Sequence, residues 1–258
     1  MDKPLVLCSV ANHIAILTLN HPEKRNALSE AMLLSLKDQF AEIAGNREVR
    51  VVILRGEGPV FSAGHDLREM VDGDEPHYAA LFSLCTEVME AVRKLPQPVI
   101  AQVHGVATAA GCQLAATCDL VVAAEQATFA TPGVKIGLFC STPAVALARA
   151  VPAKKAMEML LTGNPISAHE AERFGLVSRV VPADHLEEET LNLARQIAAA
   201  SACTLGIGKR AFYEQLALDR PAAYQVAQEA MVANAQAADA QEGMKAFLEK
   251  RPPRWTDR

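Results

Sequence analysis

Clusters of Lys and Arg are missing from this sequence of 258 residues, whose formal net charge is −5. Neither nucleic acid nor an anionic membrane is therefore expected as its main partner. Long apolar runs are missing too, because the most apolar stretch, residues 99–124, is interrupted by Gln102, His104, Gln113 and Asp119. We therefore expect no segment that spans a membrane.

The spacings typical of metal sites and of disulfide frameworks are also absent. The seven histidines form no His-x-His or His-Glu-x-x-His pattern, so no metal site is expected. No Cys-x-x-Cys pair occurs among the six cysteines, which are Cys8, Cys85, Cys112, Cys118, Cys140 and Cys203. Scattered cysteines favour reduced, mostly buried thiols, and residues 1–26 lack the pattern of a cleaved secretory signal. The sequence therefore predicts a cytoplasmic protein.

Apolar residues make up half of the chain, which is enough for one sizeable core with a smaller helical appendage. Strand patterns alternate with helical patterns in the first part of the chain, with strands expected at 10–19, 49–54, 98–107 and 120–130 and helices at 28–43 and 78–95. This alternation predicts an α/β core with crossover connections.

The pattern changes after about Pro182 to nearly continuous helix. Apolar residues recur at heptad-like positions over 186–200, 204–217 and 221–250. We therefore divide the chain into a core, residues 1–200, and a helical region, residues 201–258, that packs on itself or on a neighbouring molecule. Lys209 and Arg210 have the wrong spacing for a phosphate loop, so we place them on a helix face.

Two turns that contain glycine and other small residues follow buried strands. In "FSAGHDLREM" a helix is expected to start near Asp66, with Asp66 and Glu69 as a helix cap. In "ATAAGCQLAA", residues 107–116, small residues precede a second helix start that carries Gln113. Backbone N–H groups at two helix starts can be aimed at one oxygen, as in an oxyanion hole, although Gly and Ala at such places also serve packing alone.

Four segments together resemble the crotonase superfamily, also called the enoyl-CoA hydratase/isomerase family. They are "FSAGHDLREM", "VHGVATAAGCQLAATCDLVVAAEQATFATPGVKIGL", "AMEMLLTGNPISAHEAERFGLVSRVVP" and "EGMKAFLEKRPP", and the likeness covers nearly the whole chain. A fifth, "GLFCSTPAVALARAVP", is similar to the group of enoyl-CoA hydratase domain-containing proteins. The resemblance implies an α/β fold with a spiral core of repeated β-β-α turns and a C-terminal helical region that builds trimers or pairs of trimers.

The same resemblance implies an acyl-CoA thioester as the substrate, with coenzyme A as part of that substrate and no bound cofactor. The carbonyl oxygen of the thioester would lie between the backbone N–H groups of His65 and Ala110. These two donors would stabilise an enolate. Ala63 would lie at the coenzyme A site. Lys24 and Arg25 would lie there too. The alternative is that these two residues are solvated charges of a loop.

The tail of one subunit would also close the coenzyme A site of the next. Phe247 and Lys250 match the segment that reaches the neighbour. An amphipathic helix of a trimer would contain these residues as well, so the assignment of the two side chains rests on the resemblance alone.

Hydratases of this family resemble one another in a pair of glutamates, and both are replaced here, by Gln113 and Gly133. Neither side chain exchanges a proton at neutral pH, and no Asp or Glu occurs between Glu125 and Glu158. One positioned acid or base contributes about a hundredfold to ten thousandfold, so classical hydration should be nearly abolished. Restoring both glutamates should raise hydration if the pocket is otherwise intact.

Three side chains near the two turns have two possible roles each. The His65 ring is a candidate acid or base, or a partly exposed loop residue. The Cys140 thiol is a candidate nucleophile, or a small buried filler. Gln113 holds a water or a substrate oxygen, or it is a satisfied polar group at a helix start.

The sequence therefore supports two functions. One is an enzyme of the hydratase/isomerase family that relies on an oxyanion hole. The other is a noncatalytic acyl-CoA binding or regulatory protein that keeps the pocket without the chemistry.

Overall fold

The core is built from two β-sheets whose strands alternate along the chain. The computed structural model describes residues 3–257. The first sheet has six strands, in the spatial order β1 (Val6–Ala11), β2 (Ile14–Leu19), β3 (Val51–Gly56), β5 (Val99–Val103), β7 (Leu120–Ala124) and β10 (Arg179–Val181). The second sheet has four, in the order β4 (Val60–Ser62), β6 (Val106–Thr108), β8 (Thr128–Ala130) and β9 (Ile166–Ser167).

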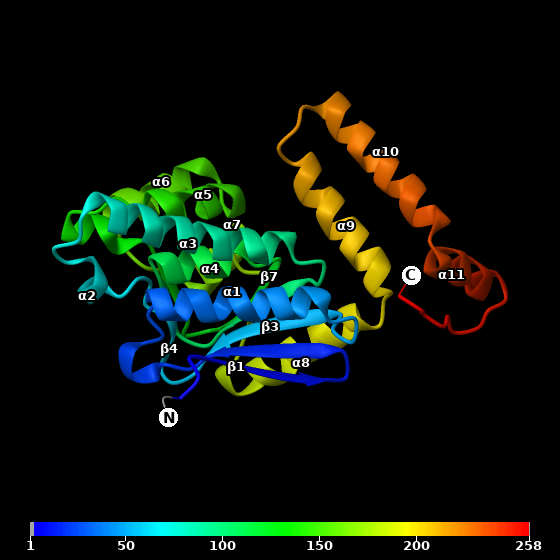
Figure 1. Cartoon of the computed structure of the whole chain (residues 1–258), viewed down its shortest axis with the longest axis horizontal. Coiled ribbons are helices and arrows are strands. Elements are labelled where there is room, and N and C mark those ends of the chain that lie inside the picture. Colours follow the sequence, from blue (N-terminus) through cyan, green and yellow to red (C-terminus); the bar gives the residue numbers. More distant parts are fainter. Residues whose placement is uncertain (1–2, 258) are drawn as a thin grey trace.

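Consecutive strands β3 and β4, β5 and β6, and β7 and β8 lie in different sheets, and helices return the chain to the first sheet. The helices of this part are α1 (Glu30–Gly45), α2 (Leu67–Met70), α3 (Glu75–Lys94), α4 (Ala110–Thr117), α5 (Ser141–Ala150), α6 (Ala153–Thr162), α7 (Ala168–Phe174) and α8 (Leu186–Ala198). Because of these crossovers, β2, β3, β5, β7 and β10 run parallel. The repeated β-β-α turns confirm the predicted α/β spiral (Figure 1).

Strand β3 shows why the first sheet is covered on both faces. Its alternate residues face opposite sides: Val52 and Leu54 join the main core, whereas Val51 and Ile53 pack in a second cluster with Leu193 of α8 and its neighbours. A parallel strand that is buried on both faces is apolar throughout, as "VVIL" is. Helix α8 therefore closes the sheet from the side opposite to the main core.

The predicted elements differ from the observed ones mainly at turns. Ser29 caps α1 by accepting a hydrogen bond from the backbone N–H of Met32 at 3.2 Å. The single strand predicted at 10–19 is wrong, because Asn12 and His13 have positive φ and turn the chain between β1 and β2. Two residues with positive φ suit the tight turn of a hairpin, and asparagine tolerates that conformation.

Three helices follow the core and stand apart from it in Figure 1, at its right-hand side. They are α9 (Ala202–Gln215), α10 (Arg220–Gln236) and α11 (Ala238–Leu248). The continuous helix predicted at 221–250 is wrong, because Ala237 is extended, with ψ of 143°, and separates α10 from α11. The boundary predicted between residues 1–200 and 201–258 stays a prediction. No helix within residues 3–257 is long and apolar enough to cross a membrane.

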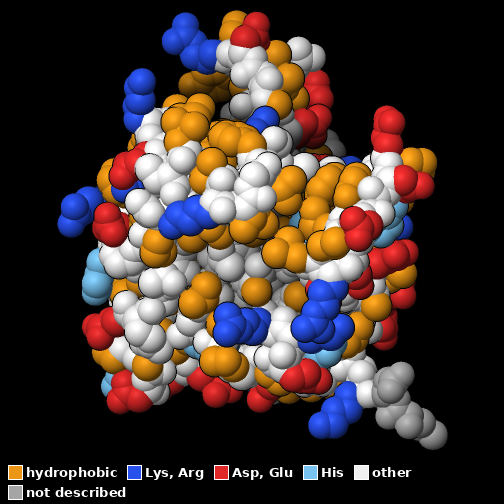
Figure 2. Space-filling model, turned by 90° about the vertical axis from the view of Figure 1, so that its left-hand side faces the viewer, with side chains coloured by type: hydrophobic (Ala, Val, Ile, Leu, Met, Phe, Trp, Pro, Cys, Tyr) orange, Lys and Arg blue, Asp and Glu red, His pale blue; other side chains and the backbone are white. Residues whose placement is uncertain are grey.

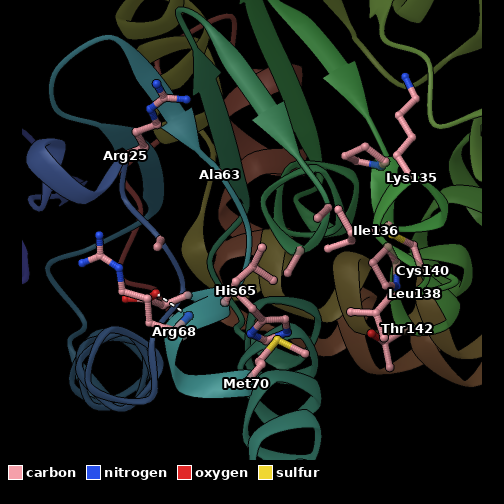
Figure 3. Close-up of a pocket in the computed structure, with 18 of the residues that line it drawn as sticks. Arg25, Ala63, His65, Arg68, Met70, Lys135, Ile136, Leu138, Cys140 and Thr142 are labelled. Carbon is pink, nitrogen blue, oxygen red and sulfur yellow. Dashed lines mark hydrogen bonds between the residues drawn. The ribbon is translucent and has the colours of Figure 1, made fainter. Parts of the chain in front are cut away.

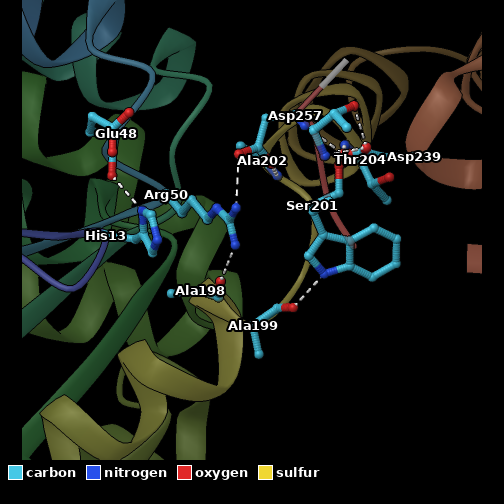
Figure 4. A network of polar contacts seen from close by, with 12 residues as sticks. His13, Glu48, Arg50, Ala198, Ala199, Ser201, Ala202, Thr204, Asp239 and Asp257 are labelled. Atoms are coloured by element: carbon cyan, nitrogen blue, oxygen red, sulfur yellow. Dashed lines mark hydrogen bonds and ion pairs between the residues drawn. The ribbon is translucent and has the colours of Figure 1, made fainter. Parts of the chain in front are cut away.

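The break at Ala237 places Asp239 where it anchors the end of the chain. The Asp239 carboxylate accepts hydrogen bonds from the backbone N–H groups of Thr256 and Asp257, at 2.7 and 2.9 Å. The Asp257 carboxylate in turn accepts from Arg50 at 2.9 Å and from the backbone N–H of Ala202 at 2.8 Å (Figure 4). The last residues therefore fasten α9 and α11 to the core.

Candidate active site

A cavity of about 720 Å³ opens beside the two predicted Gly-containing turns. Figure 3 shows His65 near its middle, with Arg25 and Arg68 on one side and Leu138 and Cys140 on the other. One wall comes from the loop that precedes α2 and from α2 itself. The other comes from the segment between β8 and α5, which includes the short 3-10 helix η2 (Pro132–Ile136). The cavity thus lies where strands of the second sheet end and helices begin.

The first turn depends on Gly64, which has φ of +86°. Its carbonyl oxygen accepts a hydrogen bond from the backbone N–H of Leu28 at 2.7 Å, which fixes the turn to the start of α1. Asp66 caps α2 by accepting from the backbone N–H of Arg68 at 3.0 Å, as predicted. Glu69 does not complete a capping box, because its carboxylate accepts from the backbone N–H of Glu30 instead.

The second turn has a strained backbone at Ala109, with φ of 51° and ψ of −122°. A non-glycine residue with positive φ is uncommon, and such strain is concentrated at functional sites. The Ala109 N–H donates to the carbonyl of Ala130 at 2.9 Å, which holds the turn against β8. Gly111 packs so closely on β4 that a Cβ atom there would collide with the carbonyl oxygen of Ser62. The small residues of α4 therefore let the helix start approach the first turn.

The two turns touch each other. A Cβ atom on Gly64 would lie 2.8 Å from the Cβ of Ala109 and 3.0 Å from the backbone nitrogen of Ala110. His65 and Ala110 both line the cavity, and neither backbone N–H donates a hydrogen bond to another residue of the described range 3–257. Two backbone donors without partners among the described residues therefore lie on adjoining turns beside the cavity.

The His65 ring is held as a neutral imidazole. Its Nδ1 lies 3.2 Å from the carbonyl oxygen of Leu28, and because that oxygen only accepts, Nδ1 carries the hydrogen. Burial lowers the pKa of His65, which outweighs the hydrogen bond to Leu28. Nε2 is buried and has no hydrogen-bond partner within residues 3–257. The lone pair of Nε2 is therefore buried without a donor among the described residues.

Gln113 is placed behind the turn and not in the cavity wall. Its side chain extends from the first half of α4, the residue is 6% exposed, and its Oε1 has no partner among the described residues. Thr131, just before η2, has an equally buried and unpartnered Oγ1. Both interpretations of Gln113 stay predictions, and its Oε1 is available to hold a water or a substrate oxygen.

The wall around Gly133 leaves no room for a longer side chain. A Cβ atom at this position would lie 2.5 Å from the carbonyl oxygen of Leu138 and 2.7 Å from the Sγ of Cys140. Gly133 is held close to Leu138, since its carbonyl oxygen accepts a hydrogen bond from the backbone N–H of Leu138 at 2.9 Å. The site therefore differs from a two-glutamate site in shape as well as in chemistry.

Basic side chains lie along the cavity wall. Lys24, Arg25, Arg68 and Lys135 line it, and the predicted contact of Lys24 and Arg25 with coenzyme A stays a prediction. Lys24 Nζ lies 3.5 Å from the Asp66 carboxylate, which keeps the lysine near the first turn. Arg68 was missed in the sequence, although its place two residues after the capping Asp66 puts it on the first turn of a helix that starts at the site.

The two predicted tail residues do not join this cavity within one chain. Phe247, near the end of α11, is 83% exposed, and Lys250 follows that helix with positive φ. Ala63, by contrast, lines the cavity, and its contact with coenzyme A stays a prediction. No group of three or more His, Cys, Asp or Glu side chains that could hold a metal is found in the part of the chain that the structure describes. The groups that line the cavity thus include backbone donors, one imidazole, cations and the carboxylates of Glu23 and Asp66.

The chain is similar to proteins of known families. A mouse protein named enoyl-CoA hydratase domain-containing protein 3, mitochondrial, is 52% identical over 241 residues, which are 93% of this chain and 80% of that protein. The human crystal structure of enoyl-CoA hydratase domain-containing protein 3 has a TM-score of 0.95 at 50% identity and covers 98% of this chain and 100% of that one. The crystal structure of a Mycobacterium smegmatis enoyl-CoA hydratase has a TM-score of 0.96 at 47% identity, with 98% and 99% covered.

These comparisons also bear on the predicted location. The mouse relative is named mitochondrial, so the cytoplasmic location predicted from the cysteines gains no support from it. The family model for enoyl-CoA hydratase/isomerase matches residues 9–258, nearly the whole chain. The resemblance drawn from the sequence motifs is confirmed, and the chain belongs to the enoyl-CoA hydratase/isomerase family.

Proposed function

We propose that this protein binds an acyl-CoA thioester and stabilises its enolate between the backbone N–H groups of His65 and Ala110. The observation that carries the proposal is the contact between the two turns, which brings both unpaired donors to one cavity. An enolate places negative charge on the thioester oxygen, and donors fixed in advance stabilise that charge without reorganising. The reaction would belong to the lyase or isomerase type.

Proton transfer then falls to groups other than the two usual carboxylates. Gln113 can accept or donate hydrogen bonds but cannot exchange a proton, and Gly133 has no side chain. His65 lines the cavity and its Nε2 has no partner among the described residues, which makes this ring the candidate proton acceptor, with Nε2 buried behind the cavity surface. Enolate-forming reactions that need less acid–base help suit this site better than hydration, such as isomerisation, in which one group can remove and return the proton, or decarboxylation, which needs only a final protonation.

The cations would bind the phosphates of coenzyme A. Lys24, Arg25 and Arg68 lie along one wall of the cavity, where charge-assisted hydrogen bonds to phosphate are strong. Phe247 and Lys250 would reach the site of a neighbouring subunit in a trimer or a pair of trimers. Exposed apolar side chains on α9, α10 and α11, such as Phe212 and Met231, support contact with another copy.

A noncatalytic acyl-CoA binding or regulatory protein is the second candidate. The missing carboxylates favour it, because the cavity and its basic residues would bind coenzyme A without them. Binding of saturated, unsaturated and malonyl-type acyl-CoA esters, followed by mass spectrometry for products, separates the two. Turnover of any ester supports the enzyme, binding without turnover supports the second candidate, and no binding contradicts both.

Restoring the two glutamates should not restore hydration. In the double variant Gln113→Glu, Gly133→Glu, the new side chain at 133 would collide with the Leu138 carbonyl and with Cys140, so the 137–140 segment must shift. We expect hydration of crotonyl-CoA to stay near the level of the parent, with Gln113→Glu alone as the matched control. Hydration far above the parent in the double variant would show that the wall adapts and that chemistry alone had been lost.

A further inference from the structure

Three large apolar side chains line the cavity and are nevertheless exposed. They are Ile136, Leu138 and Phe139, at the end of η2 and just after it, and they are 58%, 45% and 48% exposed. Figure 3 shows Ile136 and Leu138 on the side of His65 that lies opposite to Arg68. We call these three residues the apolar wall.

More apolar side chains reach the cavity from α2 and α3. Leu67 of α2 is 47% exposed and lines the cavity, and so do the half-buried Met70 and Phe82. Figure 2 shows the face of the molecule that carries α2, where hydrophobic side chains gather over a broad area and border Lys and Arg side chains. Contiguous exposed apolar side chains mark a binding groove, an interaction site or a tendency to aggregate.

The apolar wall offers no ionic partner to a ligand. Lys135 is the only charged residue in the segment 131–143. Its Nζ lies 3.0 Å from the Oδ1 of Asn164, and Figure 3 shows the ammonium group pointing away from His65. A charged end of a ligand would therefore lose water at this wall without gaining a partner, whereas a hydrocarbon chain would gain by leaving water.

The other groups of the cavity leave one place for such a chain. Lys24, Arg25 and Arg68 provide the charge that phosphates need, and the backbone N–H groups of His65 and Ala110 would hold the thioester oxygen. The acyl chain of a coenzyme A thioester extends from the carbonyl carbon on the side away from the coenzyme. It would therefore lie on the side of His65 opposite to Arg68, which is the side of the apolar wall.

We propose that the apolar wall selects thioesters with long hydrocarbon chains over short ones, so that Ile136, Leu138 and Phe139 determine the specificity for chain length. This inference rests on the proposed function, because the cations and the backbone donors must first place the thioester. Complete burial of one methylene group raises affinity about fourfold. The gain per methylene is smaller here, because the wall stays partly open to solvent. A butanoyl chain would leave most of the wall in water.

Calorimetry on the parent protein tests the proposal with coenzyme A and with its butanoyl, hexanoyl, octanoyl and decanoyl thioesters, each below its aggregation concentration. We expect the affinity to rise at every step and to be at least about tenfold higher for decanoyl-CoA than for butanoyl-CoA. The heat-capacity change of binding should become more negative with chain length, because apolar surface leaves water. Equal affinities and equal heat-capacity changes along the series would overturn the inference.

The double variant Ile136→Ser, Phe139→Ser tests whether the wall carries this preference. Both side chains are largely exposed, so their replacement should cost little stability. We expect the ratio of the decanoyl-CoA affinity to the butanoyl-CoA affinity to fall about tenfold. Val145→Ser is the matched control, because Val145 is 55% exposed on α5 and lies outside the cavity lining, and it should keep the ratio of the parent.

Coenzyme A separates failure of this inference from failure of the proposed function. A parent protein that binds neither coenzyme A nor butanoyl-CoA would overturn the proposed function and the inference with it. Binding of butanoyl-CoA with no gain for longer chains would overturn the inference alone, and so would a double variant that keeps the ratio of the parent. Sedimentation velocity adds one more outcome: a double variant with a changed oligomeric state and an unchanged ratio would assign the wall to contact between copies.

Discussion

Replacing Ala110 with proline should lower the rate of acyl-CoA conversion about a hundredfold to a thousandfold, because it removes one donor of the proposed oxyanion hole. Ala110 is the first residue of α4, and proline is favoured at the first position of a helix, where no hydrogen bond within the helix is lost. The change therefore removes the N–H group and leaves the helix start in place. Steady-state kinetics with the converted ester measures the effect on kcat.

Ala110→Gly is the matched control, since it keeps the backbone N–H and changes the side chain alone. We expect its kcat to stay far closer to the parent than that of Ala110→Pro. Both variants should still bind coenzyme A, because the proposed phosphate contacts come from Lys24, Arg25 and Arg68. Equal kcat values for Ala110→Pro and the parent would mean that this N–H does not stabilise the transition state.

Replacing Asp119 with asparagine should lower the free energy of unfolding by about 3–5 kcal/mol, because it leaves a buried lysine without its counter-charge. Lys209 of α9 lies 2.7 Å from the Asp119 carboxylate, and the two side chains are 6% and 14% exposed. The same carboxylate accepts from the Tyr213 hydroxyl at 2.7 Å and from the backbone N–H of Val99 at 2.6 Å. This network joins α9 to the core, and urea unfolding measures its loss.

The exposed pair Glu90 and Lys94 provides the control for this prediction. It has a similar contact distance of 3.3 Å, but its side chains are 55% and 76% exposed. Glu90→Gln should change the free energy of unfolding by no more than about 0.5 kcal/mol, since solvent screens such pairs. If Asp119→Asn were as mild as Glu90→Gln, the buried network would not hold α9 to the core.

The local signals of this sequence predict the parts of the fold that depend on neighbouring residues. Ser29 predicts the start of α1, and the β-rich run at 49–54 predicts the centre of β3, because caps and side-chain alternation act within a few residues. The break at Ala237 escapes such signals. The contacts that it makes possible, between Asp239 and the backbone of Thr256 and Asp257, join residues that lie far apart in the chain.

The candidate site shows the same division. His65 and Ala110 could be placed at helix starts from the sequence, but the contact between their turns depends on the packing of Gly64 against Ala109. The missing glutamate at 133 was visible in the sequence. The sequence does not show that Cys140 fills the space beside Gly133, because a bend of the chain brings these two residues together.

Deuterium uptake at the α-carbon of butanoyl-CoA in heavy water tests the central claim most directly. An enolate that forms in the cavity exchanges its α-hydrogen with solvent, whatever reaction follows, and mass spectrometry detects the gain. We predict uptake with the parent and with Ala110→Gly, and strongly reduced uptake with Ala110→Pro. Tight binding of butanoyl-CoA to the parent with no deuterium uptake would contradict the claim and leave a protein that binds acyl-CoA without activating it.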